Sequence, residues 1–230
     1  MTGRKADVDA KLPLALLEAV RRQDTPEDWL PDENPASAFP HRLGLSRVID
    51  GQVRRLHRLA RKRQRVDETE VEALLELISR RRDAPQIFAA AGRRLARYYF
   101  AGLPGFFRRT SRRLPQRLRE RALVRTLRTA NGALLPAREL AVDRAPLRVR
   151  ARGALTARVP GAGSACQLYG AFAAQLLEMA GADSVRVEHT QCQGRGDADC
   201  VWEVLADGSQ PSRRDPEPVS EPQCSSLGST

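Results

Sequence analysis

The chain has 230 residues, a length for which one main domain is expected, because single cores usually extend to about 250 residues. Apolar residues make up 41% and charged residues 29% of it, and the mean hydropathy is −0.47, which argues against a membrane protein and a wholly disordered chain. The net charge is +11, and only Lys5, Lys11 and Lys62 are lysines among the 39 basic residues. This arginine excess makes nucleic acid a candidate partner.

The N-terminal segment lacks the apolar region and cleavage site of a signal peptide, and no stretch approaches 18 uninterrupted apolar residues. We therefore expect a cytoplasmic protein without a membrane span. Residues 12–22 have the apolar spacing of a short helix, and prolines recur through 24–40, which predicts an extended arm. The expected main domain covers 41–206, and the polar residues 207–230 are expected to be disordered.

The middle of the chain is expected to be helical. Residues 43–65 predict a basic helix, and a second helix is predicted up to Ser79, with Asp67 as its N-cap and Glu70 as the capping-box partner. Asp83 is the predicted cap of a third helix, in which Gly92 allows a close approach by a neighbouring element.

Gly102, Pro104 and Gly105 end that third helix, and helical spacing then continues to Asn131. Beyond it, the alternation of apolar and polar residues over 139–152 predicts a half-buried strand. A helix over 165–180 follows, and then strands over 184–190 and 200–205. Helices first and strands later make the expected fold α+β.

Three of the four cysteines and one of the three histidines lie within 35 residues near the C-terminus: Cys166, His189, Cys192 and Cys200. Ser164 and Gln167 have the spacing of a capping box, which places Cys166 at the start of the helix. Thiolate and imidazole are zinc ligands, and four of them fill a tetrahedral site, so the predicted ion is structural rather than catalytic. Two alternatives remain: cysteines buried as small apolar residues, and a redox pair of Cys192 with Cys200.

The run CQLYGAFAAQLLEMAG, followed six residues later by EHTQCQGRGDADCVWEV, resembles the C-terminal signature of the 4-vinyl-reductase domain. The resemblance is specific over 164–205, within a signature region of 137–205, and loose over 84–163. It implies the fold of TRAPP vesicle-tethering subunits, with helices on one face of a small antiparallel sheet, and a homodimer. The family includes bacteriochlorophyll-biosynthesis proteins and the sensory domains of phenol-responsive NtrC-type activators.

In those sensors zinc is held by Cys, Glu, Cys and Cys at the intervals of Cys166, His189, Cys192 and Cys200. The resemblance therefore implies Zn²⁺ at these residues, with His189 at the position of the family's Glu. Glu188 is the alternative ligand, through a shift of register.

We expect such a domain to bind a small hydrophobic ligand or another protein. Aromatic and apolar residues of the preceding helices are the candidate lining of its ligand pocket: Phe88, Leu95, Tyr98, Tyr99, Phe106 and Phe107. The alternative is that these residues only form the hydrophobic core. Arg117 and Ala145 stand where the phenol sensors have their effector-binding His and Trp, so phenol specificity is not expected.

No G-x-S-x-G nucleophile motif, P-loop or dinucleotide-binding motif is present. We therefore expect a non-catalytic sensory or carrier domain; an accessory factor of bacteriochlorophyll-type pigment biosynthesis is an alternative.

A second function class is suggested by the charge of residues 41–130, which hold 24 basic and 8 acidic residues. Phosphate or acidic-partner binding needs such asymmetry. The candidate face comprises Arg54, Arg55, Arg58, Arg61, Lys62 and Arg65. Aromatic residues are not interleaved with it, and a solvated basic face is the simpler interpretation.

Overall fold

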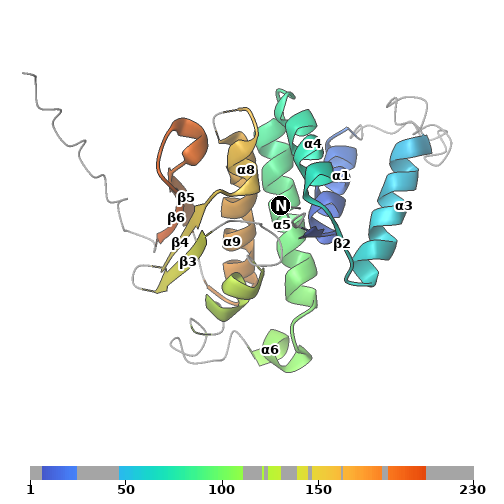
Figure 1. The fold of residues 1–230 in the computed structure, drawn as a ribbon. Coiled ribbons are helices and arrows are strands. Elements are labelled where there is room, and N and C mark those ends of the chain that lie inside the picture. Colours follow the sequence, from blue (N-terminus) through green and yellow to red (C-terminus); the bar gives the residue numbers. More distant parts are fainter. Residues whose placement is uncertain are drawn as a thin grey trace, which may run out of the picture.

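The fold is known from a computed structural model, which describes residues 7–24, 47–110, 121, 124–130, 139–144, 147–161, 163–182 and 186–205. The predicted proline-rich arm and the C-terminal segment from 207 lie outside these residues. Within them the chain is α+β, as predicted, with a helical N-terminal half and two small antiparallel sheets (Figure 1). None of the described helices is long and apolar enough to cross a membrane.

The N-terminal half consists of helices joined by a two-stranded ribbon. The ribbon pairs β1 (Asp7–Asp9) with β2 (Arg65–Asp67). The helices of this half are α1 (Lys11–Gln23), α3 (Arg47–Arg61), α4 (Glu68–Ser79), α5 (Ala84–Ala101) and α6 (Gly105–Thr110).

The C-terminal half contains a four-stranded antiparallel sheet in the order β3-β4-β6-β5. Its strands are β3 (Glu139–Arg144), β4 (Leu147–Arg152), β5 (Arg186–Gln191) and β6 (Cys200–Leu205). Between β4 and β5 lie α8 (Leu155–Arg158), the 3₁₀ turn η2 (Ser164–Cys166) and α9 (Gln167–Met179), and the 3₁₀ turn η3 (Gln193–Arg195) precedes β6.

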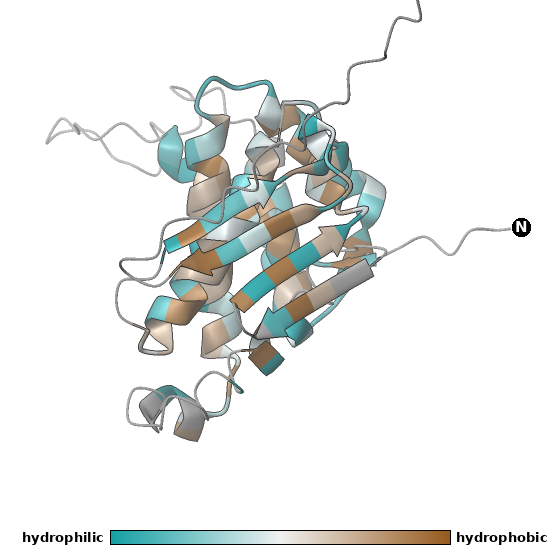
Figure 2. Cartoon of the chain, turned by 90° about the vertical axis from the view of Figure 1, so that its left-hand side faces the viewer, coloured by the Kyte–Doolittle hydropathy of each residue, from teal (hydrophilic) through white to brown (hydrophobic). Residues whose placement is uncertain are grey.

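One face of this sheet is apolar and packs on the helices, whereas the other carries charges. Val149 and Trp202 are paired neighbours on the inner face and are both buried. On the outer face Arg148 lies 2.8 Å from Glu203 of the adjacent strand. Figure 2 shows the helices behind the sheet and the alternation of apolar and polar residues along its strands. This is the usual pattern of an antiparallel sheet with one solvated face.

Helix α9 lies between the sheet and α5, and α1 and α3 follow on the far side of α5 (Figure 1). Gly92 of α5 makes the close approach to α9 possible, as predicted. A Cβ built at Gly92 would lie 2.2 Å from the carbonyl oxygen of Leu168 and 3.0 Å from the amide nitrogen of Phe172. The backbone of α9 therefore occupies the space of a side chain on α5.

Several local predictions are confirmed only in part. Asp67 does cap α4, accepting from the Thr69 N–H at 2.9 Å, and Arg55 binds the carboxylate of Glu70 at 2.8 Å. Asp83 makes no capping hydrogen bond, since Arg81 holds its carboxylate at 2.9 Å. There an arginine competes successfully with backbone N–H groups for a carboxylate.

The single strand predicted over 139–152 is wrong, because β3 and β4 form a hairpin. Val142 pairs with Val149 across it. Each strand alternates with period two, but the apolar positions of the alternation change from even numbers (Leu140, Val142) to odd ones (Val149, Ala151), which is the sequence signal of two strands. Pro146 in the sequence is a second signal, since proline disfavours the interior of a central strand.

Candidate metal centre

The structure brings Cys166, His189, Cys192 and Cys200 together, and their potential ligand atoms all lie within 4.8 Å of one another. The Sγ atoms of Cys166 and Cys192 are 3.9 Å apart. Two thiolates bound to tetrahedral zinc at about 2.3 Å are roughly 3.8 Å apart, so this pair already has the required separation. The four residues are close enough to hold a metal ion.

Three different elements supply these side chains. Cys166 lies at the junction of η2 and α9, His189 is on β5, and Cys200 opens β6. Cys192 follows the end of β5 directly. A bound ion would therefore connect the N-terminus of α9 to the β5–β6 hairpin.

A β-bulge explains how His189 and Cys192 reach the same site. Side chains alternate along a strand, so residues three positions apart normally face opposite sides of a sheet. Here His189 pairs with Trp202 while Gln191 pairs with Val201, so Thr190 is an extra residue in β5. Such a bulge shifts the alternation by one residue. It brings Cys192 onto the face of His189.

Hydrogen bonds around the sulfur atoms favour a thiolate. The Gln193 N–H donates to Cys200 Sγ at 3.4 Å, and the hydroxyl of Thr156 lies 3.4 Å from Cys166 Sγ. A hydrogen bond from Cys166 lowers the pKa of the Cys200 thiol to about 4, and the Gln193 N–H contributes. The same hydrogen bond, together with burial, raises the pKa of Cys166. Both sulfurs are wholly buried.

His189 is held by aromatic packing and has one unused nitrogen. Its ring stacks on Trp202 with centroids 4.9 Å apart, and Tyr169 also stacks on Trp202, at 4.6 Å. The Trp202 indole N–H donates to the carbonyl of Cys166 at 3.3 Å, which ties β6 to the start of α9. Among the described residues, the buried Nε2 of His189 has no hydrogen-bond partner. An unpaired buried nitrogen is costly, and a metal ion would satisfy it.

The loops around the cluster fix the position of Cys192. Gly163 has a φ of +84°, and a Cβ there would lie 2.5 Å from Cys192 Sγ. Asp197 accepts a hydrogen bond from the Cys192 N–H at 2.6 Å. Only glycine fits at position 163, because both the backbone conformation and the nearby sulfur exclude a side chain.

The ligand set is closed and rich in sulfur, which is the composition of structural zinc sites. The three cysteines are fully buried, and four protein ligands leave no open position for water. Glu188, the alternative ligand, does not belong to the group; its carboxylate lies 2.8 Å from Arg186. The predicted capping box at Ser164 is wrong, because η2 replaces the first turn of α9 and Ser164 makes no capping bond.

The sequence did not identify several residues that support the cluster: Thr156, Gly163, Trp202 and Asp197. Two of them left a weak signal in the sequence. Gly163 is a glycine of the segment GAGS, and Asp197 is an acidic residue of the loop after Cys192. Nothing in the sequence distinguished Trp202 from an ordinary core residue. Contacts across elements of this kind are visible only in three dimensions.

A groove of about 650 Å³ lies beside the cluster. Small residues of α9, including Gly170 and Ala174, form one wall, and β5 contributes Val187 and His189. Five of the six candidate ligand-pocket residues, all but Phe107, do not line this groove. Phe88 and Leu95 are fully buried core residues, Tyr98 and Tyr99 are partly buried, and Phe106 is 76% exposed. The side chain of Phe107 lies outside the description.

Tyr98 and Tyr99 contact acidic residues through their hydroxyl groups. Tyr98 donates to Glu18, and Tyr99 donates to Asp9 at 3.0 Å. Burial is the main reason that the pKa of each tyrosine is raised.

The candidate basic face is exposed, as a solvated or partner-binding surface must be. Its residues lie on α3, just after it, or on β2, and all six are exposed: Arg54, Arg55, Arg58, Arg61, Lys62 and Arg65. Arg55 is bound by Glu70 at 2.8 Å, so its charge is partly neutralised.

Comparison with known proteins identifies no relative: no family model, curated protein or solved structure matches the chain.

Proposed function

We propose that Cys166, His189, Cys192 and Cys200 bind one structural zinc ion in a non-catalytic sensory or carrier domain of the 4-vinyl-reductase type. The observation that carries this proposal is the buried, unpartnered Nε2 of His189 among three buried sulfur atoms. Zinc provides four strong bonds and neutralises thiolate charge. Metal binding of this kind contributes directly to folding, because the unfolded chain has no preformed site.

The ion would stabilise the groove as well as the fold. The groove is lined by Cys166 and His189 themselves, so its shape depends on their positions. Its volume is in the range of small-molecule sites, and its walls include Ala171 and Val187. This supports a small, partly apolar ligand, or a partner side chain, bound next to the zinc site.

Metal content is measured by native mass spectrometry of the purified protein, which also reports oligomeric state and any bound small molecule. We expect one zinc per chain. Cys192→Ser and His189→Ala lose the metal and melt at lower temperature, whereas Cys224→Ser, at the one cysteine outside the cluster, retains it. Either of two results contradicts the proposal: wild-type protein that contains no metal, or a Cys192→Ser variant with the metal content and melting temperature of the wild type.

Ligand binding is tested separately with the fluorescent probe anilinonaphthalene sulfonate on the zinc-loaded protein. We expect saturable binding that Ala174→Leu weakens by filling the groove. Glu178→Leu, which places the same side chain at an exposed position of α9, serves as the control. Equal binding by both variants shows that the probe does not occupy the groove.

A further inference from the structure

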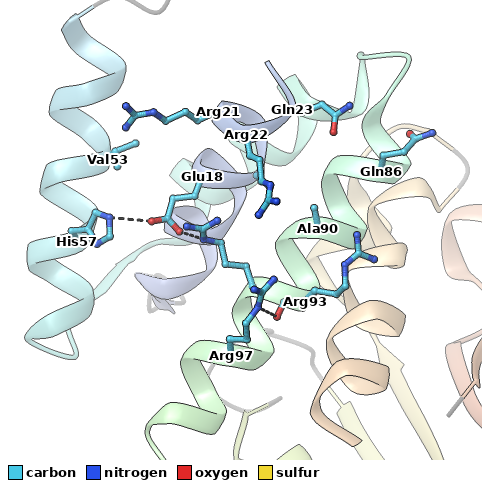
Figure 3. Close-up of a pocket in the computed structure, with 12 residues that line it drawn as sticks. Glu18, Arg21, Arg22, Gln23, Val53, His57, Gln86, Ala90, Arg93 and Arg97 are labelled. Carbon is cyan, nitrogen blue, oxygen red and sulfur yellow. Dashed lines mark hydrogen bonds and ion pairs between the residues drawn. The ribbon is translucent and has the colours of Figure 1, made fainter. Parts of the chain in front are cut away.

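A second cavity lies between α1, α3 and α5, and it shares one lining residue, Arg93, with the groove beside the cluster. It is a cleft of about 1150 Å³. In Figure 3 Arg22 of α1 points toward α5, from which Arg93 and Arg97 rise. Val53 and His57 of α3 form the opposite wall.

The cleft is strongly positive. Among the described residues, five arginines line it against one carboxylate, a net charge of +4 with His57 neutral. These residues are Arg21, Arg22, Arg93, Arg94, Arg97 and Glu18. A concave surface of one sign of charge focuses the electrostatic potential and attracts ligands of the opposite sign.

The single carboxylate is already fully engaged. Glu18 is only 11% exposed and lies 3.1 Å from His57 Nε2. It also contacts Arg94 and the hydroxyl of Tyr98. Glu18 therefore holds Arg94 in place and has no capacity left to neutralise the other arginines.

Three other arginines of the cleft, Arg22, Arg93 and Arg97, form no ion pair with a carboxylate in the part of the chain that the structure describes. Arg21 pairs with Asp50 at 3.8 Å. Arg93 and Arg97 are four residues apart on α5, where like charges destabilise a helix. The free protein thus carries a repulsion that a bound anion would relieve.

We propose that this cleft binds a small ligand carrying several phosphate groups. Guanidinium groups bind phosphate in a bidentate manner, and arginines on two facing helices suit more than one phosphate. Single-stranded nucleic acid is less suited, because its bases need aromatic side chains to stack on, and none of the described lining residues is a phenylalanine, tyrosine or tryptophan. None of the four cluster residues lines the cleft, although Arg93 also lines the groove beside the cluster.

The probe is inorganic tripolyphosphate, added to the full-length protein in calorimetric titrations at 50 mM and 200 mM salt. We expect one saturable site whose affinity falls at the higher salt concentration. Arg22→Gln with Arg97→Gln removes one charge from each facing helix; both side chains are exposed, so the fold is retained, and neither lines the groove beside the cluster. This double variant is expected to weaken binding roughly tenfold or more, since each charge-assisted contact is worth about a factor of ten.

The matched control is Arg54→Gln with Arg58→Gln, which removes the same charge from the exposed face of α3 outside the cleft. It is expected to change the affinity less than about twofold, as exposed charges contribute little at a distance. ATP that competes with tripolyphosphate identifies a nucleotide ligand, and failure to compete identifies an inorganic polyphosphate; both results support a phosphate site.

Three results overturn the proposal. The first is the absence of saturable tripolyphosphate binding at 50 mM salt. The second is equal weakening by the two double variants, which would mean a general effect of surface charge. The third is tighter binding of a 20-base-pair DNA duplex that depends on Arg54 and Arg58, which would assign the basic charge to nucleic acid.

Discussion

Gly92→Ala is the substitution that most sharply separates helix propensity from packing. Gly92 is in the interior of α5, where alanine in place of glycine ordinarily stabilises a helix by about 0.5–1 kcal/mol. At this position the new methyl group would lie 2.2 Å from the carbonyl oxygen of Leu168. That oxygen belongs to the backbone of α9 and cannot rotate away.

The size of the effect follows from that distance. Ordinary contacts begin at about 3.4 Å, so α5 and α9 would have to separate locally by about 1 Å. Overpacking of a close-packed core costs about 1–3 kcal/mol, and the upper part of that range applies because backbone atoms must move. After the propensity gain is subtracted, we expect a net destabilisation of about 2 kcal/mol, or roughly 4–8 °C in melting temperature.

The same displacement reaches the metal centre. Leu168 is two residues from Cys166, so a shift of α9 moves one sulfur away from the three ligands on the β5–β6 hairpin. Gly92→Ala is therefore expected to weaken zinc binding in a chelator competition as well as to lower stability in denaturant titrations.

Gly51→Ala is the matched control, because Gly51 is in the interior of α3 and no atom of the described residues lies within 4 Å of an added Cβ. It should stabilise the protein by about 0.5–1 kcal/mol. A Gly92→Ala protein as stable as the wild type, with unchanged zinc affinity, would refute the close packing of α5 on α9.

Two further predictions concern the metal-binding loop and alkaline stability. Gly163→Ala is expected to weaken zinc binding at least tenfold in a chelator competition, because its Cβ would crowd Cys192 Sγ. Gly196→Ala is the control: it has similar backbone strain, with a φ of +100°, but no described atom lies near its Cβ, so it should retain zinc. Burial raises the pKa of Tyr99 and Tyr169 strongly, so above about pH 10 the unfolded chain loses two protons that the folded chain keeps, and stability falls by up to about 3 kcal/mol per pH unit. Tyr99→Phe should reduce that slope by about one half in denaturant titrations at pH 9 to 11, and an unchanged slope would show that Tyr99 ionises freely in the fold.

The sequence predicted most of the elements and the members of the cluster, because both depend on local patterns. Helical spacing defines α5, and strand alternation defines β6. The four ligands could be found from their residue types and intervals alone. Gly92 could also be identified, since a glycine on the apolar face of a helix indicates a close approach.

What the sequence missed depends on competition between distant residues. The capping role of Asp83 was lost to Arg81, which also binds Asp24, 57 residues away along the chain. The bulge at Thr190 has no signature in the residue pattern, although it decides which face Cys192 occupies. The phosphate cleft is also invisible in the sequence, because its arginines come from segments more than 70 residues apart.

The central claim is that Cys166, His189, Cys192 and Cys200 hold one zinc ion between α9 and the β5–β6 hairpin. X-ray absorption at the zinc edge of the purified protein tests it most directly, because it reports the ligand atoms themselves. We predict three sulfur atoms at about 2.3 Å, one nitrogen at about 2.0 Å and the outer-shell scattering of a single imidazole. A spectrum with four sulfur atoms, or with an oxygen-rich shell and no imidazole signal, would contradict the assignment.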